Sequence, residues 1–522
     1  MPSTSSINRR NALGGRAVLL ACALLCLSRP DAVSAQVRGA YLPLDHTAHT
    51  VAEFLVTRGV LLGLDAMSRP FPLDELRASV ARAEARGVEG DGDIERLAWL
   101  QAVLGRSVDS TEWAISVAPD VGALGATSAV PELLLPASDS TITPTARLRI
   151  GAEFGPAAFQ FEPQRVQDGR ARIPLALARV GWSWGWIQWG EVERNWGVPG
   201  VTGLLVGPLA GSRPELAFGI GPQVLRFEYR AAPLSDGVST STGETVARYW
   251  AMHRLRWRPM EEFELAVWET SLSSETGGPD AARASPFTPF YFPGQQDRDN
   301  ARNTTMGLDV MWRPSSSVLL ETQLLVDDIY KDRTPGTEPY PHRYGYTVQA
   351  RGPLGPDRTW RVYTTALSGL PLINRRPEDS FLDDGQPLGR LRPDHFEAGG
   401  FITIPWGFTS PGAGPSRNSW PGPGSAEVGV KWRRQGIRTF DDPWPVLPPG
   451  TPRYPTFSPE VEREVWAFVG NVDWMAGPFT LQTETHLQYR RFPDAGGDWE
   501  WGLESIVEVV WRIGRWNWSG QN

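Results

Sequence analysis

The residue types that most often carry out catalysis or bind metals are scarce in this chain. Its 522 residues include two cysteines and six histidines. His46 and His49 stand three apart and could share a helical face, but no third metal ligand is near them in the sequence, so a solvated surface pair is the better interpretation. Gly181 to Gly185 has the letters Gly-x-Ser-x-Gly of a hydrolase nucleophile elbow, yet it lies in an apolar run without a following helix. We therefore expect no catalytic residue, no metal site and no cofactor.

Two acidic pairs offer oxygen atoms for binding. Asp327-Asp328 and Asp383-Asp384 could bind Ca²⁺ or accept hydrogen bonds from sugar hydroxyls. Paired carboxylates would also suit a glycoside hydrolase, but the sequence does not give their separation. The simpler alternative is that each pair lies in a solvated loop or strand end.

Tryptophan is the other residue type suited to sugars, and the chain has 23 of them. Sugar rings stack on aromatic side chains, so a lectin is one interpretation of the cluster Trp182, Trp184 and Trp186. These three share one parity, however, and an aromatic belt at a membrane interface is the favoured explanation. Trp196 stands past the end of this segment, beside Asn195, and is the better candidate for a ligand contact.

The N-terminus predicts export. Three arginines precede an apolar run from residue 17 to 27, and small residues close the segment before residue 36. This order is typical of a cleaved secretory signal peptide, here residues 1–35. Cleavage would remove both cysteines, four arginines and one aspartate, which shifts the formal net charge from −8 to −11. The mature chain would then form no disulfide and would not attract nucleic acid.

Residues 36–106 predict a small helical bundle. Helices are expected from Thr47 to Thr57, from a cap at Asp74 through Arg86, and from Asp93 onward. Three short amphipathic helices are too few for a catalytic domain. Beyond the N-terminus, no run approaches the ~18 apolar residues that a membrane helix needs.

From about Glu112 the period of the pattern changes to two. Between Trp499 and Ile513 apolar and ionic residues alternate, so that Leu503 falls on one face and Glu504 on the other. This strand is much longer than the ~5–6 residues usual in globular proteins. Alternation of this kind over strands of membrane-spanning length predicts a lipid-facing apolar side and a polar lumen.

Turn signals alternate with longer loops along the same region. The expected turns are Arg258-Pro259-Met260, Arg313-Pro314-Ser315, Gly352 to Asp357 and Ala476-Gly477-Pro478, and the Pro/Gly-rich loops are 275–300, 371–394, 409–424 and 440–459. Outer-membrane barrels have this asymmetry, with tight periplasmic turns and long external loops. Residues 107–522 are enough for about 16–18 strands at ~10 residues each plus connections. We expect an all-β transmembrane antiparallel β-barrel of about 16–18 strands with a small N-terminal helical element. A large soluble sandwich or propeller is the alternative.

Several short motifs resemble the capsule-assembly Wzi-like family of outer-membrane barrels. The stretch Arg194-Asn195-Trp196-Gly197-Val198-Pro199-Gly200 is similar to the family's Trp-Gly-Pro-Gly segment. Trp268-Glu269 is similar to a hairpin that leads to an acidic rim position, and Leu324 to Asp328 continues the series in the same order. The resemblance covers roughly residues 45–515. It implies a barrel, here residues 107–522, with residues 36–106 at its periplasmic end, and a lectin-like role in holding surface polysaccharide.

The resemblance also sets the expected site and partners. The polysaccharide-binding candidates are Arg194, Asn195, Trp196, Glu269, Asp327 and Asp328. We expect a non-enzymatic monomer in the outer membrane of a Gram-negative bacterium, in contact with surface polysaccharide, outer-membrane lipid and lipopolysaccharide. A substrate-selective porin or transport channel, with the helices as a partial plug, is the alternative, and an outer-membrane hydrolase is a third possibility.

Overall fold

The computed structural model describes most of the chain. The described residues are 39–105, 111–127, 142–165, 171–208, 211–275, 286–287, 289, 302–329, 342–374, 376–390, 392–407, 422–440, 442, 455–493 and 496–521. The expected signal peptide, residues 1–35, lies outside them, as do most residues of the expected loops 275–300, 409–424 and 440–459.

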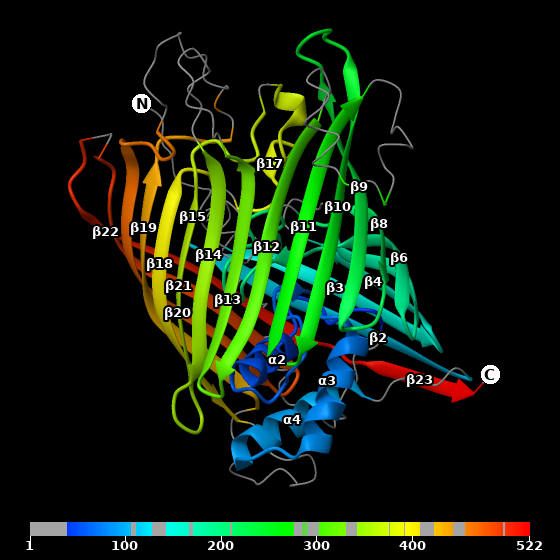
Figure 1. The fold of residues 1–522 in the computed structure, drawn as a ribbon. Coiled ribbons are helices and arrows are strands. Elements are labelled where there is room, and N and C mark those ends of the chain that lie inside the picture. Colours follow the sequence, from blue (N-terminus) through cyan, green and yellow to red (C-terminus); the bar gives the residue numbers. More distant parts are fainter. Residues whose placement is uncertain are drawn as a thin grey trace, which may run out of the picture.

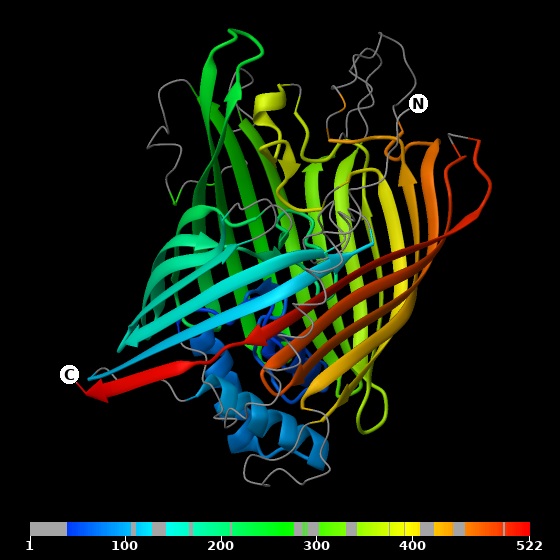
Figure 2. The same ribbon diagram turned by 180° about the vertical axis from the view of Figure 1, so that it is seen from behind.

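The long alternating strands close into an antiparallel β-barrel (Figures 1 and 2). In the described part of the chain its strands are β2 (Glu112–Ala126), β3 (Ile142–Phe154), β4 (Ala157–Arg165), β5 (Ala171–Trp182), β6 (Gly185–Val192), β8 (Pro214–Ile220), β9 (Leu225–Val238), β10 (Thr245–Met260), β11 (Phe263–Glu275), β12 (Arg302–Ser315), β13 (Val318–Asp328), β14 (Arg343–Pro353), β15 (Thr359–Leu367), β18 (His395–Trp406), β19 (Gly424–Gly436), β20 (Val461–Ala476), β21 (Phe479–Arg491), β22 (Glu500–Arg512) and β23 (Trp516–Gln521). Both β22 and β23 pair with β2, one after the other, and so occupy a single position that closes the barrel. The described residues therefore form an 18-stranded barrel, which confirms the expected fold class.

Alternation along the strands separates an apolar outer face from an ionic inner face. In β22, Trp501 is 61% exposed and Leu503 57%, whereas Glu504 and Glu508 are 8% and 5% exposed. The same division holds in β13, where Glu321 is fully buried. Since successive strand side chains point to opposite faces, every second residue enters the lumen. An apolar exterior around a polar interior is the arrangement of outer-membrane barrels.

The two ends of the barrel differ in the length of their connections. At one end, short turns such as Ser183-Trp184 and Gly477-Pro478 join neighbouring strands, and the expected turns lie here. At the other end the connections are longer. From the sequence, loop 409–424 is expected among these long external loops, and this expectation is wrong. Trp406 pairs with Gly424, which pairs with Trp474 in turn, so the loop leaves the barrel at the tight-turn end.

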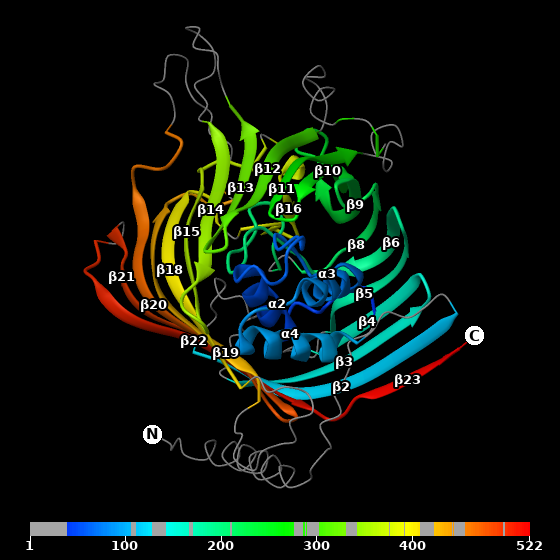
Figure 3. The same cartoon turned by 60° about the horizontal axis from the view of Figure 1, so that its bottom comes forward.

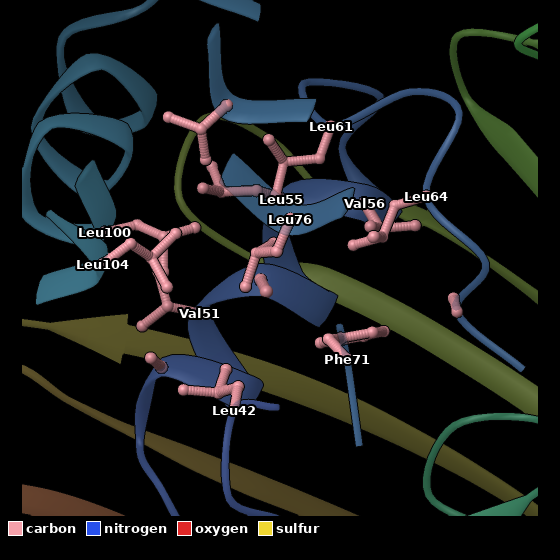
Figure 4. Packing of buried hydrophobic residues seen from close by; sticks show 14 of the residues in the cluster. Leu42, Val51, Leu55, Val56, Leu61, Leu64, Phe71, Leu76, Leu100 and Leu104 are labelled. Carbon is pink, nitrogen blue, oxygen red and sulfur yellow. The ribbon is translucent and has the colours of Figure 1, made fainter. Parts of the chain in front are cut away.

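Three helices lie at the tight-turn end, within the ring of strands when the barrel is seen from that end (Figure 3). They are α2 (Ala48–Thr57), α3 (Leu73–Arg86) and α4 (Asp91–Leu104), and we call residues 39–105 the plug. No described helix is both long and apolar enough to cross a bilayer. The plug has its own hydrophobic core, in which Leu55, Leu76 and Leu100 from the three helices meet (Figure 4).

Two sequence predictions about local structure need correction. Trp182, Trp184 and Trp186 do not share a face, because Ser183 and Trp184 form a turn between β5 and β6 that resets the alternation. Trp186 is buried and faces the lumen, whereas Trp182 and Trp184 are exposed. In the plug, α3 begins at Leu73, so Asp74 lies in the first turn rather than at the cap.

Candidate functional site

Two segments at the long-loop end fold into the lumen. They are residues 193–213 and 368–394, and we call them the inner loops. Their described residues Leu204, Leu372 and Phe381 pack with Trp268 and Leu325 of the barrel wall in one hydrophobic cluster. These segments contain the short pieces β7 (Asn195–Trp196), η3 (Pro377–Asp379), β16 (Leu382–Asp383) and β17 (Gln386–Pro387). The plug and the inner loops therefore fill the lumen beside β8–β15.

On the opposite side of the lumen a chamber of ≈ 1210 Å³ remains. It is bounded by α2 of the plug, by the turn Pro199–Thr202 of an inner loop, and by the inner faces of β3–β5, β15 and β18–β21. Its lining mixes apolar and polar side chains, and hydroxyl groups from Thr50, Thr403 and Ser425 lie among charged groups. Because it lies inside the barrel, the chamber is the candidate functional site.

Ion pairs organise the charged side chains of the chamber. All seven arginines on its described lining are in an ion pair; they are Arg69, Arg147, Arg172, Arg351, Arg361, Arg390 and Arg433. Arg433 and Arg390 both contact Glu397, at 2.5 and 3.5 Å. Paired guanidinium and carboxylate groups hold each other in fixed orientations, so the polar atoms of the lining are positioned before any ligand arrives.

A group of hydrogen-bonded side chains in the lining surrounds Arg361 and Glu427. The Arg361 guanidinium donates two hydrogen bonds to the Glu427 carboxylate, of 2.7 and 2.8 Å. It lies 4.0 Å from the ring centre of Phe401. Asn471 Nδ2 and Thr403 Oγ1 each donate to Glu427 at 3.4 Å. The chamber therefore presents a carboxylate and an amide, the planar hydrogen-bonding groups that suit hydroxyl-bearing ligands.

The plug contributes to the chamber through the start of α2. Thr47 and Thr50 donate hydrogen bonds of 2.9 and 3.1 Å to the two oxygens of Asp473 on β20. His49, one position earlier than Thr50, was expected on a wet surface with His46, and that expectation is wrong because both rings are buried. His49 Nε2 contacts the carbonyl of Leu42 at 2.8 Å.

Burial lowers the pKa of both plug histidines. The pKa of His49 falls to about 3, although the hydrogen bond to the Leu42 carbonyl opposes the shift. Burial, and then the nearby Arg512, hold the pKa of His46 well below its ordinary value. Both rings are therefore neutral in the folded plug at neutral pH. Within the described residues, no group of three or more His, Cys, Asp or Glu side chains could hold a metal ion.

Asn195 is the one predicted site residue that the described chamber lining includes. Its amide accepts a hydrogen bond from Gly203 N at 2.8 Å and donates one to the Val201 carbonyl at 3.3 Å. These bonds hold the turn in which Gly200 has φ +75° and approaches Arg361. The positive φ favours glycine there, and a Cβ at Gly200 would also lie 2.8 Å from Arg361 Cζ. Asn195 thus shapes the chamber wall.

Arg194 and Trp196 point away from the chamber and make internal contacts. Arg194 pairs with Glu215 at 2.5 Å, and this carboxylate outweighs burial and raises the pKa of Arg194. Trp196 is 5% exposed. Its Nε1 donates to Asp309 at 2.9 Å, and its ring lies 5.2 Å from that of Trp268. Trp196 therefore anchors the inner loop. A contact between its ring and a sugar stays a prediction, and it would require the ring to separate from Trp268.

The acidic candidates also lie outside the described chamber lining. Glu269 contacts His253 at 2.9 Å and shares its parity in β11 with the exposed Val267, so it faces outward. Asp327 and Asp328 contact Arg343 at 3.0 and 2.8 Å. Asp327 also accepts a hydrogen bond from the backbone N–H of Leu372, which ties an inner loop to the wall. Their role in sugar binding stays a prediction.

Residues that form the chamber were mostly not identified from the sequence. His486 of β21, for example, contacts Glu484 at 3.0 Å. Arg361, Glu427 and Asn471 carry no motif. The signal that could have found them is the inward parity of ionic residues on neighbouring strands, once the order of the strands is known.

Comparisons with known proteins agree on the fold. No family model matches the sequence, and no curated protein matches it. The chain is similar to the structure of Wzi, an outer-membrane protein involved in group 1 capsule assembly in Escherichia coli and described as a carbohydrate-binding β-barrel. The TM-score is 0.59 at 12% identity, over 91% of this chain and 99% of that chain.

The chain also matches OprD and OccD3 (OpdP) of Pseudomonas aeruginosa, with TM-scores of 0.41 and 0.43 and identities of 9% and 10%. These matches cover 80% and 78% of this chain and 97% and 93% of those chains. At 12% identity the likeness to Wzi shows the fold alone, which is that of a large outer-membrane β-barrel.

Proposed function

We propose that this protein is a non-catalytic outer-membrane barrel that binds or organises a surface polysaccharide. The observation that carries the proposal is the chamber, a cavity inside a barrel whose lining includes oriented carboxylate, amide and hydroxyl groups. Sugars present many hydroxyls, each of which donates and accepts hydrogen bonds, and such a lining complements them. The barrel fold shared with the carbohydrate-binding Wzi supports the same conclusion.

In this proposal the tight-turn end and the plug face the periplasm, and the longer loops face outward, as in other outer-membrane barrels. The apolar outer face contacts lipid, and a cleaved signal peptide over residues 1–35 directs export. The protein acts as a monomer, since a closed barrel needs no partner to pair its strand edges.

A substrate-selective channel is the second candidate, and the ionic lumen favours it. Charged side chains also line the lumens of porins. Against a channel stand the plug and the inner loops, which are fixed to the wall by buried polar contacts. Arg248, for example, donates hydrogen bonds to the carbonyls of Glu378, Ser380 and Leu382.

Conductance in planar bilayers separates the two candidates. The full-length protein should show no steady open-channel current, because its lumen holds the plug and the inner loops. A steady ohmic current would instead support the channel. Heat-modifiable mobility on a denaturing gel is the control that the inserted protein is folded.

A further inference from the structure

We infer that the chamber itself takes an uncharged oligosaccharide, held by hydrogen bonds to Asn471 and Asp473 rather than by stacking on aromatic rings. This inference rests on the proposed function and adds the place and the chemical class of the ligand.

The charge balance of the chamber argues for an uncharged ligand. Its described lining has eight Arg or Lys side chains and nine Asp or Glu side chains. Each of the arginines already contacts a carboxylate, as described above. A sugar acid would therefore have to displace a carboxylate from an arginine, or bring an uncompensated charge into the barrel. Both cost free energy, because each leaves a charge without its partner. An uncharged ligand requires neither.

The geometry of the lining favours hydrogen bonds to hydroxyls. Glu427 is held by Arg361, Thr403 and Asn471, yet its side chain is still 21% exposed. A carboxylate accepts about four hydrogen bonds, and Glu427 already accepts four, two from Arg361 and one each from Thr403 and Asn471. The acceptor that remains in this group is Oδ1 of Asn471, which is buried and has no hydrogen-bond partner among the described residues. Asp473, across the cavity toward α2, is oriented in the same way by two threonines.

Ring stacking is disfavoured beside Arg361, because the two aromatic faces there are already covered. The Arg361 guanidinium lies over Phe401, and Tyr363 stacks with Phe401 at 6.0 Å between ring centres. Both rings are buried, and Tyr363 donates its hydroxyl hydrogen to Glu397 at 2.8 Å. The rings thus hold Arg361 in place, and Arg361 positions Glu427.

The size of the chamber argues for more than one sugar unit. Pockets for drug-sized ligands measure about 300–1,000 Å³. The chamber, at ≈ 1210 Å³, lies above that range. A short oligosaccharide with accompanying water fits this volume better than a single sugar.

The test uses the full-length protein, folded in detergent, and oligosaccharides released from the surface polysaccharide of the cells that make it. Anion exchange separates these into an uncharged and an acidic fraction, and titration calorimetry measures binding of each. The uncharged fraction should bind more tightly than the acidic one.

Two chamber variants then locate the site. Glu427→Gln removes the carboxylate that orients Asn471 and pairs with Arg361, and it should weaken binding of the uncharged fraction at least tenfold. Asn471→Ala leaves the Arg361–Glu427 ion pair intact and should weaken binding several-fold, so the test does not depend on one variant folding. Glu462→Gln, at an exposed ion pair with Arg392 outside the described chamber lining, is the matched control and should bind as the wild type does.

The outcomes separate the inference from the proposed function. If folded protein binds neither fraction, the proposed function is wrong. If the acidic fraction binds more tightly, or if both chamber variants bind the uncharged fraction as the wild type does, the chamber inference is wrong while the proposed function survives. Selective loss in the two chamber variants supports both.

Discussion

The attachment of the plug to the barrel depends on a buried ion pair that can be removed with little change of shape. Asp65 of the plug contacts Arg254 of β10 at 2.7 Å and Arg256 at 3.5 Å, and all three side chains are buried. Burial alone would raise the pKa of Asp65, but the two guanidinium groups outweigh it and hold the pKa well below its ordinary value. The carboxylate is therefore ionised, and Asp65→Asn removes the charge while keeping the side-chain shape.

The expected loss follows from the charges that remain. Removing one partner of a buried pair usually costs about 3–5 kcal/mol, because the other charge stays buried. Asp309 and Glu264 remain 3.5 and 3.7 Å from Arg254 and compensate part of its charge. We therefore expect the lower end of that range, ~3 kcal/mol, which is roughly a hundredfold in the docking equilibrium.

Cysteine labelling measures this equilibrium, since the chain has no cysteine after residue 26. Ser79 of α3 is fully buried, and Ser79→Cys places a thiol of similar size in the plug core. The maleimide labelling rate should rise roughly a hundredfold when Asp65→Asn is added. Glu261→Gln is the matched control, because Glu261 is only partly buried and pairs with the exposed Arg86, so its effect should stay below about fivefold. A rate for Asp65→Asn within that control range would refute the reasoning.

Two further predictions concern the inner loop and pH. Gly203→Ala would place a Cβ 1.8 Å from the carbonyl oxygen of Trp196, so the inner loop should lose ~1–3 kcal/mol of stability and trypsin should cleave residues 193–213 faster. Gly181→Ala, where a Cβ meets nothing within 4 Å, should leave cleavage unchanged, and equal rates for both variants would contradict the loop packing. For pH, the pKa of His49 is lowered to about 3 in the docked plug, while a released His49 titrates near its ordinary value of about 6.5. Docking should therefore be fully stable above pH ~6.5 and weaken as pH falls toward 3. Labelling of Ser79→Cys, normalised to free cysteine at each pH, should accelerate on acidification, and a pH-independent ratio would contradict this.

The barrel could be predicted from the sequence because its physical signal is local. Each strand such as β22 must place residues like Leu503 in lipid and Glu504 in the lumen, so alternation is visible residue by residue. The strand end at Trp182 was missed because Trp184 and Trp186 continue the same alternation through a turn. Aromatic residues suit both a strand and the membrane interface next to a turn, so their type does not mark the boundary.

The site could not be predicted because it depends on contacts between distant segments. His49 looks like a surface residue in its own helix, and only the fold of the plug covers it. Trp196 follows the end of a strand, where exposure is reasonable, but the inner loops bury it against Trp268. Glu427 and Arg361 meet only when β15, β18 and β19 lie side by side. The motif that contains Asn195 does lie at the chamber, where Asn195 holds a turn of the inner loop.

The measurement that tests the central claim most directly is binding of the intact surface polysaccharide by the folded full-length protein. With the polysaccharide immobilised, the account predicts saturable binding by protein that shows heat-modifiable gel mobility, and loss of that binding after the barrel is unfolded by boiling. Absence of binding by the folded protein, across polysaccharide concentrations that saturate the sensor surface, would contradict the account.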